Sequence, residues 1–357
     1  MIKRIASVLL GACIALAPSP AAATATDDWR SLMQKAGILH QQGRYDQAAA
    51  MVTEALEIAE VRQGPNHPDV ATSLNFLALL HSEKGRYQAA EPLYKRSLAI
   101  MEKALGPEHQ SVAIALGNLA ELYQAQGLFA EAEPLYTRAV EIAVAALGPD
   151  HPNVAASLNN LAGLHYARGD FAAAEPLYER VLSIREKAFG PDNSAVAASL
   201  NNLATLYRAR GQYAAAEPLY ERSLAIVVRR AGPDDPGVVI ALNNLAELYA
   251  AQGEFAAAEH LYQRSLAILE QALGPEHPDI DQSLNYLAEL YRAQRRYGAA
   301  EHMYRRSLAL REKHLGPDHR IVANSLENIA KLYSMMGKSD DARKLSERAA
   351  RIRARMR

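Results

Sequence analysis

Residues 235–276 have the sequence DPGVVIALNNLAELYAAQGEFAAAEHLYQRSLAILEQALGPE, in which two amphipathic segments flank a turn. Apolar residues recur at helical spacing in both segments. This spacing predicts one helix from about Pro236 to Ala251 and a second from about Ala256 to Ala272. Gly253 lies between them, and glycine is a common helix terminator. The stretch therefore predicts two helices joined by a tight turn.

The same pattern recurs along the chain at an interval of 42 residues. A turn glycine returns in each unit except one, where Arg295 stands, and a Gly-Pro pair marks each junction between units. A fixed period of this size is the mark of a solenoid of stacked repeats. The turn glycines are Gly43, Gly85, Gly127, Gly169, Gly211, Gly253 and Gly337, and the junction glycines are Gly64, Gly106, Gly148, Gly190, Gly232, Gly274 and Gly316.

The junctions carry signals that stop one helix and start the next. In LGPDHPNV, residues 147–154, we expect Gly148 to adopt the left-handed conformation that ends a helix, and Pro149 to prevent its continuation. His151 then stands at the N-cap position. Equivalent positions also hold Asn193 and Asp235, which cap helices well but replace a histidine metal ligand poorly. The periodic histidines therefore predict helix caps, and no metal site is expected.

Several motifs together identify a family resemblance. SLNNLATLY (199–207), PLYKRSLAI (92–100) and the junction LGPDHPNV resemble tetratricopeptide repeats, in particular the 42-residue type found in kinesin light chains and many bacterial proteins. The resemblance implies an all-α, right-handed superhelical solenoid of about eight helix-turn-helix repeats that binds peptides in a concave groove. We place the repeats at about 27–66, 67–108, 109–150, 151–192, 193–234, 235–276, 277–318 and 319–357.

The first 25 residues have a different character. Two basic residues precede an apolar run and a stretch of small residues, which is the order found in a secretory signal peptide. We expect cleavage after Ala23 or Ala25 and a bacterial protein that is exported, either periplasmic or secreted. The alternative is a lipoprotein anchored through Cys13, the single cysteine. The apolar run is too short for a membrane span.

Composition and motifs exclude several functions. Lys and Arg together number 39 against 40 for Asp and Glu, so no overall charge points to nucleic acid. The chain contains no phosphate-binding loop, metalloprotease motif or nucleophile elbow, and we predict neither an enzyme nor a cofactor.

Tyrosines that recur at one position in each helix are expected to pack the core, and glutamates that open each second helix are expected to favour its N-terminus.

Paired asparagines suggest a binding surface. In 199–207, Leu200, Leu203 and Leu206 lie on one side of the predicted helix, and Asn201 and Asn202 lie on the other. The first asparagine position is occupied by Asn75, Asn159, Asn201, Asn243 and Asn285, and the second by Asn118, Asn160, Asn202, Asn244 and Asn328. An amide donates and accepts hydrogen bonds at once, so such a row is suited to hold a peptide backbone.

The predicted peptide site therefore consists of the asparagines, with three charged residues that bias the choice of peptide: Asn118, Asn159, Asn160, Asn201, Asn202, Asn243, Asn244 and Asn285, with Arg208, Glu247 and Arg292. An alternative is that these asparagines bond to neighbouring repeats or face water. The predicted function is a scaffold that binds a protein or peptide partner. The alternative function is an assembly factor of an envelope or secretion complex that acts through self-association or its convex face.

Overall fold

A computed structural model describes residues 20–355, with side chains from residue 28 onward. Residues 1–19, which include Cys13 and most of the predicted signal peptide, lie outside the described residues. The chain divides into two compact units, unit 1 up to Arg168 and unit 2 from Gly169 onward. Within the described part, no helix is both long enough and apolar enough to cross a membrane.

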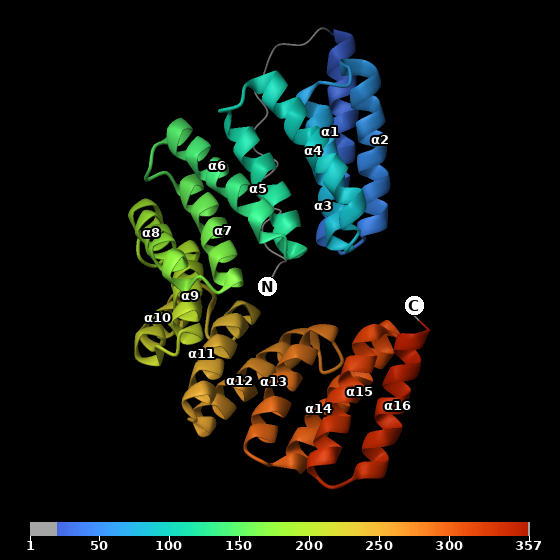
Figure 1. The fold of residues 1–357 in the computed structure, drawn as a ribbon, viewed down its shortest axis with the longest axis vertical. Helices are drawn as coiled ribbons and strands as arrows, with labels where there is room; N and C mark the ends of the chain where they lie inside the picture. The colour runs from blue at the N-terminus through green and yellow to red at the C-terminus, as the bar shows by residue number, and fades with distance from the viewer. Residues whose placement is uncertain (1–19, 356–357) are drawn as a thin grey trace. The chain divides into compact units, whose positions relative to one another are not determined.

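Helices account for all the regular structure of the described residues, and consecutive helices run antiparallel within each unit (Figure 1). Unit 1 contains α1 (Pro20–Gln41), α2 (Tyr45–Gln63), α3 (Pro68–Glu83), α4 (Tyr87–Leu105), α5 (Gln110–Ala125), α6 (Phe129–Leu147) and α7 (Pro152–Arg168). Unit 2 contains α8 (Phe171–Phe189), α9 (Ser194–Ala209), α10 (Tyr213–Ala231), α11 (Val239–Gln252), α12 (Phe255–Leu273), α13 (Asp281–Ala293), α14 (Tyr297–Leu315), α15 (Arg320–Met335) and α16 (Ser339–Ala354). These sixteen helices confirm the predicted all-α solenoid of about eight helix pairs. We call the odd-numbered helices first helices and the even-numbered ones second helices.

The helix pair predicted in residues 235–276 is present at nearly the predicted bounds. Its first helix starts as a short 3-10 turn, η2 (Pro236–Val238), and continues as α11 to Gln252. Its second helix, α12, covers Phe255–Leu273. A similar turn, η3 (Pro278–Ile280), precedes α13. Helical periodicity in the sequence was therefore sufficient to find both helices.

The junction histidines cap helices as predicted. Each accepts a hydrogen bond at Nδ1 from the backbone N–H two residues later, at 3.2 Å for His67, 3.1 Å for His109, 3.1 Å for His151, 3.2 Å for His277 and 3.2 Å for His319. Asn193 and Asp235 make the same bond through their side-chain oxygens, at 2.9 and 2.7 Å. Among the described residues, no group of three or more potential ligands is placed to hold a metal ion.

The junction glycines differ from the prediction in one dihedral angle. Gly148 has the expected positive φ of 82°, but its ψ is 157°, so the residue is not left-handed helical. The cause is Pro149, because a residue before proline is pushed away from helical ψ values. Only glycine adopts this combination readily. The turn glycine Gly253, which no proline follows, has φ 83° and ψ 7° and is left-handed helical.

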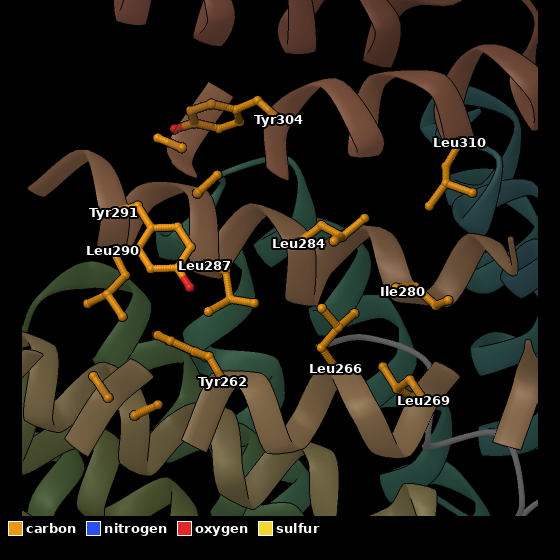
Figure 2. Close-up of a cluster of buried hydrophobic side chains, with 14 of the residues drawn as sticks. Tyr262, Leu266, Leu269, Ile280, Leu284, Leu287, Leu290, Tyr291, Tyr304 and Leu310 are labelled. Carbon is orange, nitrogen blue, oxygen red and sulfur yellow. The ribbon is translucent and has the colours of Figure 1, made fainter. Parts of the chain in front are cut away.

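The core forms where second helices pack against first helices. In unit 2, Leu266 of α12 lies close to Leu284 and Leu287 of α13 (Figure 2), and all three side chains are buried. The alanine that opens each second helix has 0% exposure in the first seven repeats, at Ala48, Ala90, Ala132, Ala174, Ala216, Ala258 and Ala300, and its equivalent in the eighth, Ala342, is 6% exposed. Burial of this position leaves no room for a larger side chain, which is what close packing of the two helices requires. Tyr262 and Tyr304 are also buried, as predicted for core tyrosines.

Side chains also connect successive repeats. The glutamate near the start of a second helix accepts a hydrogen bond from the tyrosine hydroxyl of the next first helix, at 3.0 Å for Tyr123 to Glu91, 3.2 Å for Tyr249 to Glu217, 3.0 Å for Tyr291 to Glu259 and 2.8 Å for Tyr333 to Glu301. Arg306 of α14 similarly donates to the carbonyl of Pro275 at 3.1 Å and pairs with Glu270 of α12. These glutamates and arginines therefore help to set the register between repeats.

Replacing Arg295 by glycine is expected to stabilise the protein. Arg295 stands at a turn-glycine position and has a φ of 59°, a conformation that costs a non-glycine residue about 1 kcal/mol. Arg295→Gly should therefore raise the thermal midpoint, whereas Arg295→Ala should not, because alanine retains the Cβ that is disfavoured at this φ. Differential scanning calorimetry of the two variants tests this, and equal midpoints would contradict it.

Candidate functional site

The predicted site lies on one side of the first helices, which we call the first-helix face. Neighbouring first helices contact each other directly, α3 with α5 and α5 with α7 in unit 1, and α9 with α11 in unit 2. In α9, Leu200, Leu203 and Leu206 are buried, whereas Asn201 and Asn202 are half-buried on the opposite side. The helix therefore presents its asparagines away from the core, as the sequence predicts.

Asparagines of neighbouring first helices bond to one another. In unit 1, Asn118 Nδ2 donates to Asn75 Oδ1 at 2.9 Å. In unit 2, Asn244 Nδ2 donates to Asn201 Oδ1 at 2.7 Å. In both asparagine pairs the second position of one repeat meets the first position of the preceding repeat, 43 residues earlier. These four asparagines therefore bond to a neighbouring repeat, which is the alternative to peptide binding that the sequence left open.

One asparagine in this row lacks such a partner. Asn243, on α11, is 7% exposed, and its Oδ1 has no hydrogen-bond donor within the described residues. The residue 43 positions later is Tyr286 in place of an asparagine. Tyr286 stacks on Tyr262 with ring centroids 5.2 Å apart and an interplanar angle of 10°. The row of asparagine pairs is therefore interrupted between α11 and α13.

Asn285 is placed differently from the other predicted ligands. Its Nδ2 donates to the backbone oxygen of Asp281 at 2.7 Å and to Ser307 Oγ, on α14, at 2.9 Å. It also lies 3.2 Å from Asp281 Oδ1. The amide nitrogen of Asn285 is thus directed to the second helix of its own repeat. Asn159 and Asn160 are half-buried on α7 in unit 1.

The charged residues predicted to bias peptide choice pair with other residues of the face. Arg208 Nη2 on α9 lies 2.9 Å from Glu247 Oε2 on α11, and both side chains are about a quarter exposed. Arg292 pairs with Glu289 one turn earlier on α13, at 2.5 Å, and this contact raises the pKa of the Arg292 guanidinium. Within unit 2, the face therefore combines charges of both signs that are already neutralised.

Tyrosines of the second helices contribute hydroxyl groups to this face. Tyr136 Oη donates to Gln124 at 3.1 Å, and Tyr220 Oη lies 2.8 Å from Thr205 Oγ1. Burial raises the pKa of both phenols, so they stay protonated. The sequence identified these tyrosines as core residues but not as polar groups of the face. The sequence does hold a signal for this role. The position is tyrosine in every repeat from Tyr94 to Tyr304, although phenylalanine would fill the core equally well, which indicates that the hydroxyl group is needed.

Unit 1 has an acidic feature on the same face. Glu121 of α5 occupies the position equivalent to Glu247, and burial, together with the charge of Glu83, raises the pKa of its carboxyl. Glu83 Oε2 lies 2.8 Å from His40 Nε2. The two units therefore differ in the electrostatics of their first-helix faces, although their repeats share one pattern.

The tetratricopeptide repeat family profile matches residues 30–103, 111–187, 159–227, 195–271, 237–313 and 279–355. Comparison with curated protein sequences gave no match. Among solved structures, nearly identical TPR-like repeats of a candidate kinesin light chain from Podosopora anserina share 31% identity over 58% of this chain and 98% of that chain, with a TM-score of 0.52.

Two further structures are similar. BtubC (BKLC) from P. vanneervenii is 25% identical, covers 64% of this chain and 92% of its own, and has a TM-score of 0.56. The apo quorum sensor NprR from B. thuringiensis is similar in fold, with 13% identity, coverage of 91% and 87%, and a TM-score of 0.64. On the family match and the repeat geometry, the chain belongs to the tetratricopeptide repeat family, with repeats like those of kinesin light chains.

Proposed function

We propose that this protein is a non-enzymatic scaffold that holds an extended segment of a partner protein against its first-helix face. Membership of the tetratricopeptide repeat family supports a role in protein–protein interaction. The observation that carries the proposal is the recurrence of amide groups along this face in both units, with Asn118 bonded to Asn75 and Asn244 bonded to Asn201.

The asparagine pairs retain capacity for a ligand. An amide–amide hydrogen bond uses one of the two N–H groups of the donor and one lone pair of the acceptor, so further donors and acceptors remain. The bond also fixes the orientation of both side chains before a ligand arrives, which reduces the entropy lost on binding. Packed helices lie about 10 Å apart, which corresponds to about three residues of extended chain. The amide groups of successive first helices within a unit therefore suit every third residue of a partner backbone.

The exposed surface of α16 favours this function over assembly through that helix. On α16, the exposed side chains are mostly charged and include Asp340, Arg343, Lys344 and Glu347. A charged outer face is what a solvated terminal repeat requires. The composition of residues 1–25 supports export of the scaffold. If the protein instead acts by self-assembly, light scattering should detect oligomers without added peptide.

Combined replacement of Asn160, Asn202 and Asn244 by alanine tests the proposal. Each lost hydrogen bond removes about 0.5–1.5 kcal/mol, so the triple variant should bind a peptide selected from a random library at least about tenfold more weakly. Fluorescence anisotropy with the labelled peptide measures this change.

The matched control replaces Asn66 by alanine, because Asn66 is an exposed asparagine in the turn between α2 and α3, outside the first helices. This control should bind the peptide with unchanged affinity. If the triple variant also retains its affinity and its helical circular dichroism, the asparagines do not hold the partner.

A further inference from the structure

The first-helix face of unit 2 contains a buried acceptor without a donor. Asn243 is more than nine-tenths buried, and Oδ1 has no hydrogen-bond partner in the described part of the chain. Leaving a buried carbonyl oxygen unpaired costs free energy, so native structures rarely do so without a reason. Asn243 therefore marks an incomplete polar site on the first-helix face of unit 2.

The repeats themselves show which group is missing. Asn75 and Asn201 stand at the same position as Asn243, and each accepts a hydrogen bond from the asparagine 43 residues later. For Asn243 the residue at that offset is Tyr286, whose ring packs on Tyr262 and whose hydroxyl accepts from Gln282 Nε2 at 2.8 Å. The donor that is present in the intact pairs and absent here is the N–H of a carboxamide.

The charged groups of this face in unit 2 disfavour a charged ligand group. Arg208 of α9 is paired with Glu247 of α11, and Arg292 of α13 is paired with Glu289. A ligand ammonium or carboxylate buried among these pairs would lack its own counterion, and such burial costs more than burial of a neutral group. An uncharged donor is therefore the better match for Asn243.

We propose that this site recognises an asparagine or glutamine side chain of the bound segment, whose carboxamide donates to Asn243 Oδ1. The ligand amide would donate to Asn243 in the same way as the Asn244 amide donates to Asn201 in the intact pair. Because Asn243 is nearly buried, its side chain has to rotate so that Oδ1 becomes accessible on the first-helix face when the ligand amide binds. The inference rests on the proposed function and assigns a side-chain preference to one segment of the groove.

Parallel selection of a random-sequence peptide library tests this preference. The full chain and two variants, Tyr286→Asn and Asn243→Leu, serve as targets, and circular dichroism establishes that each is folded. Tyr286→Asn supplies the missing internal donor, and Asn243→Leu removes the acceptor while keeping a side chain of similar size. Peptides selected on the natural sequence should show a several-fold enrichment of Asn or Gln at one aligned position. Both variants should lose this enrichment, and Tyr286→Asn, which changes no residue of the predicted peptide site, should do so while it still selects peptides.

The outcomes separate the two proposals. Enriched peptides without an Asn or Gln preference, or a preference that persists in a folded variant, would overturn this inference and leave the scaffold function standing. If the natural sequence selects no peptide, the scaffold function itself fails, and the inference fails with it. Since the two variants act on opposite members of the site, loss of folding in one leaves the other as the deciding test.

Discussion

Replacing Asp281 by alanine is expected to lower the free energy of unfolding by about 3 kcal/mol, because Arg311 is left without its counterion. Asp281 Oδ2 accepts from Arg311 Nε at 2.8 Å and from Nη2 at 2.6 Å. The two side chains are 20% and 18% exposed. Asp281 Oδ1 also accepts from Ser307 Oγ at 2.5 Å, so the substitution removes several bonds at once. Urea denaturation followed by circular dichroism measures the loss.

The control for this variant is the same substitution two residues earlier. The Asp279 side chain is 74% exposed and has only a distant contact of 3.9 Å with His277. Asp279→Ala should therefore change the stability by less than about 0.5 kcal/mol. The double variant Asp281→Leu with Arg311→Met should recover most of the loss, because it replaces both charges by apolar groups. Equal stabilities of Asp281→Ala and Asp279→Ala would show that the pair is not stabilising.

Replacing Ala258 by leucine is expected to destabilise unit 2 by about 3 kcal/mol, at the upper end of the range for overpacked cores. Ala258 has no exposed surface, and it lies near the start of α12 in a buried cluster that also contains Leu242 and Ala246 of α11. A leucine side chain has no space there, so α12 has to move away from α11. The thermal midpoint and the urea midpoint of the full chain should both fall.

A matched substitution separates overpacking from a change in helix propensity. Ala256 lies on the same helix and is exposed, and alanine and leucine are both strong helix formers. Ala256→Leu should therefore be nearly neutral. If Ala258→Leu proves equally neutral, close approach of the two helices does not depend on the alanine.

The sequence alone was sufficient for the features that depend on nearby residues. Apolar spacing located α11 and α12, and the cap function of His151 followed from its exchange with Asn193 and Asp235 at equivalent positions. The burial of the repeated alanines could also be predicted, because each lies at the same place in every helix pair. Even the exception at Gly148 has a local cause, since Pro149 alone restricts its ψ.

The partners of the polar groups on the first-helix face required the tertiary structure. Asn244 meets Asn201, and Glu247 meets Arg208, only because α9 and α11 lie side by side with a particular offset. The repeat pattern places these residues on the correct side of each helix but does not state the rotation and shift between neighbouring helices. Those quantities are set by the packing of buried side chains across repeats. For this reason the sequence predicted the row of asparagines and placed Tyr286 within it, whereas the unpaired Oδ1 of Asn243 and the stacking of Tyr286 on Tyr262 became visible only in the folded chain.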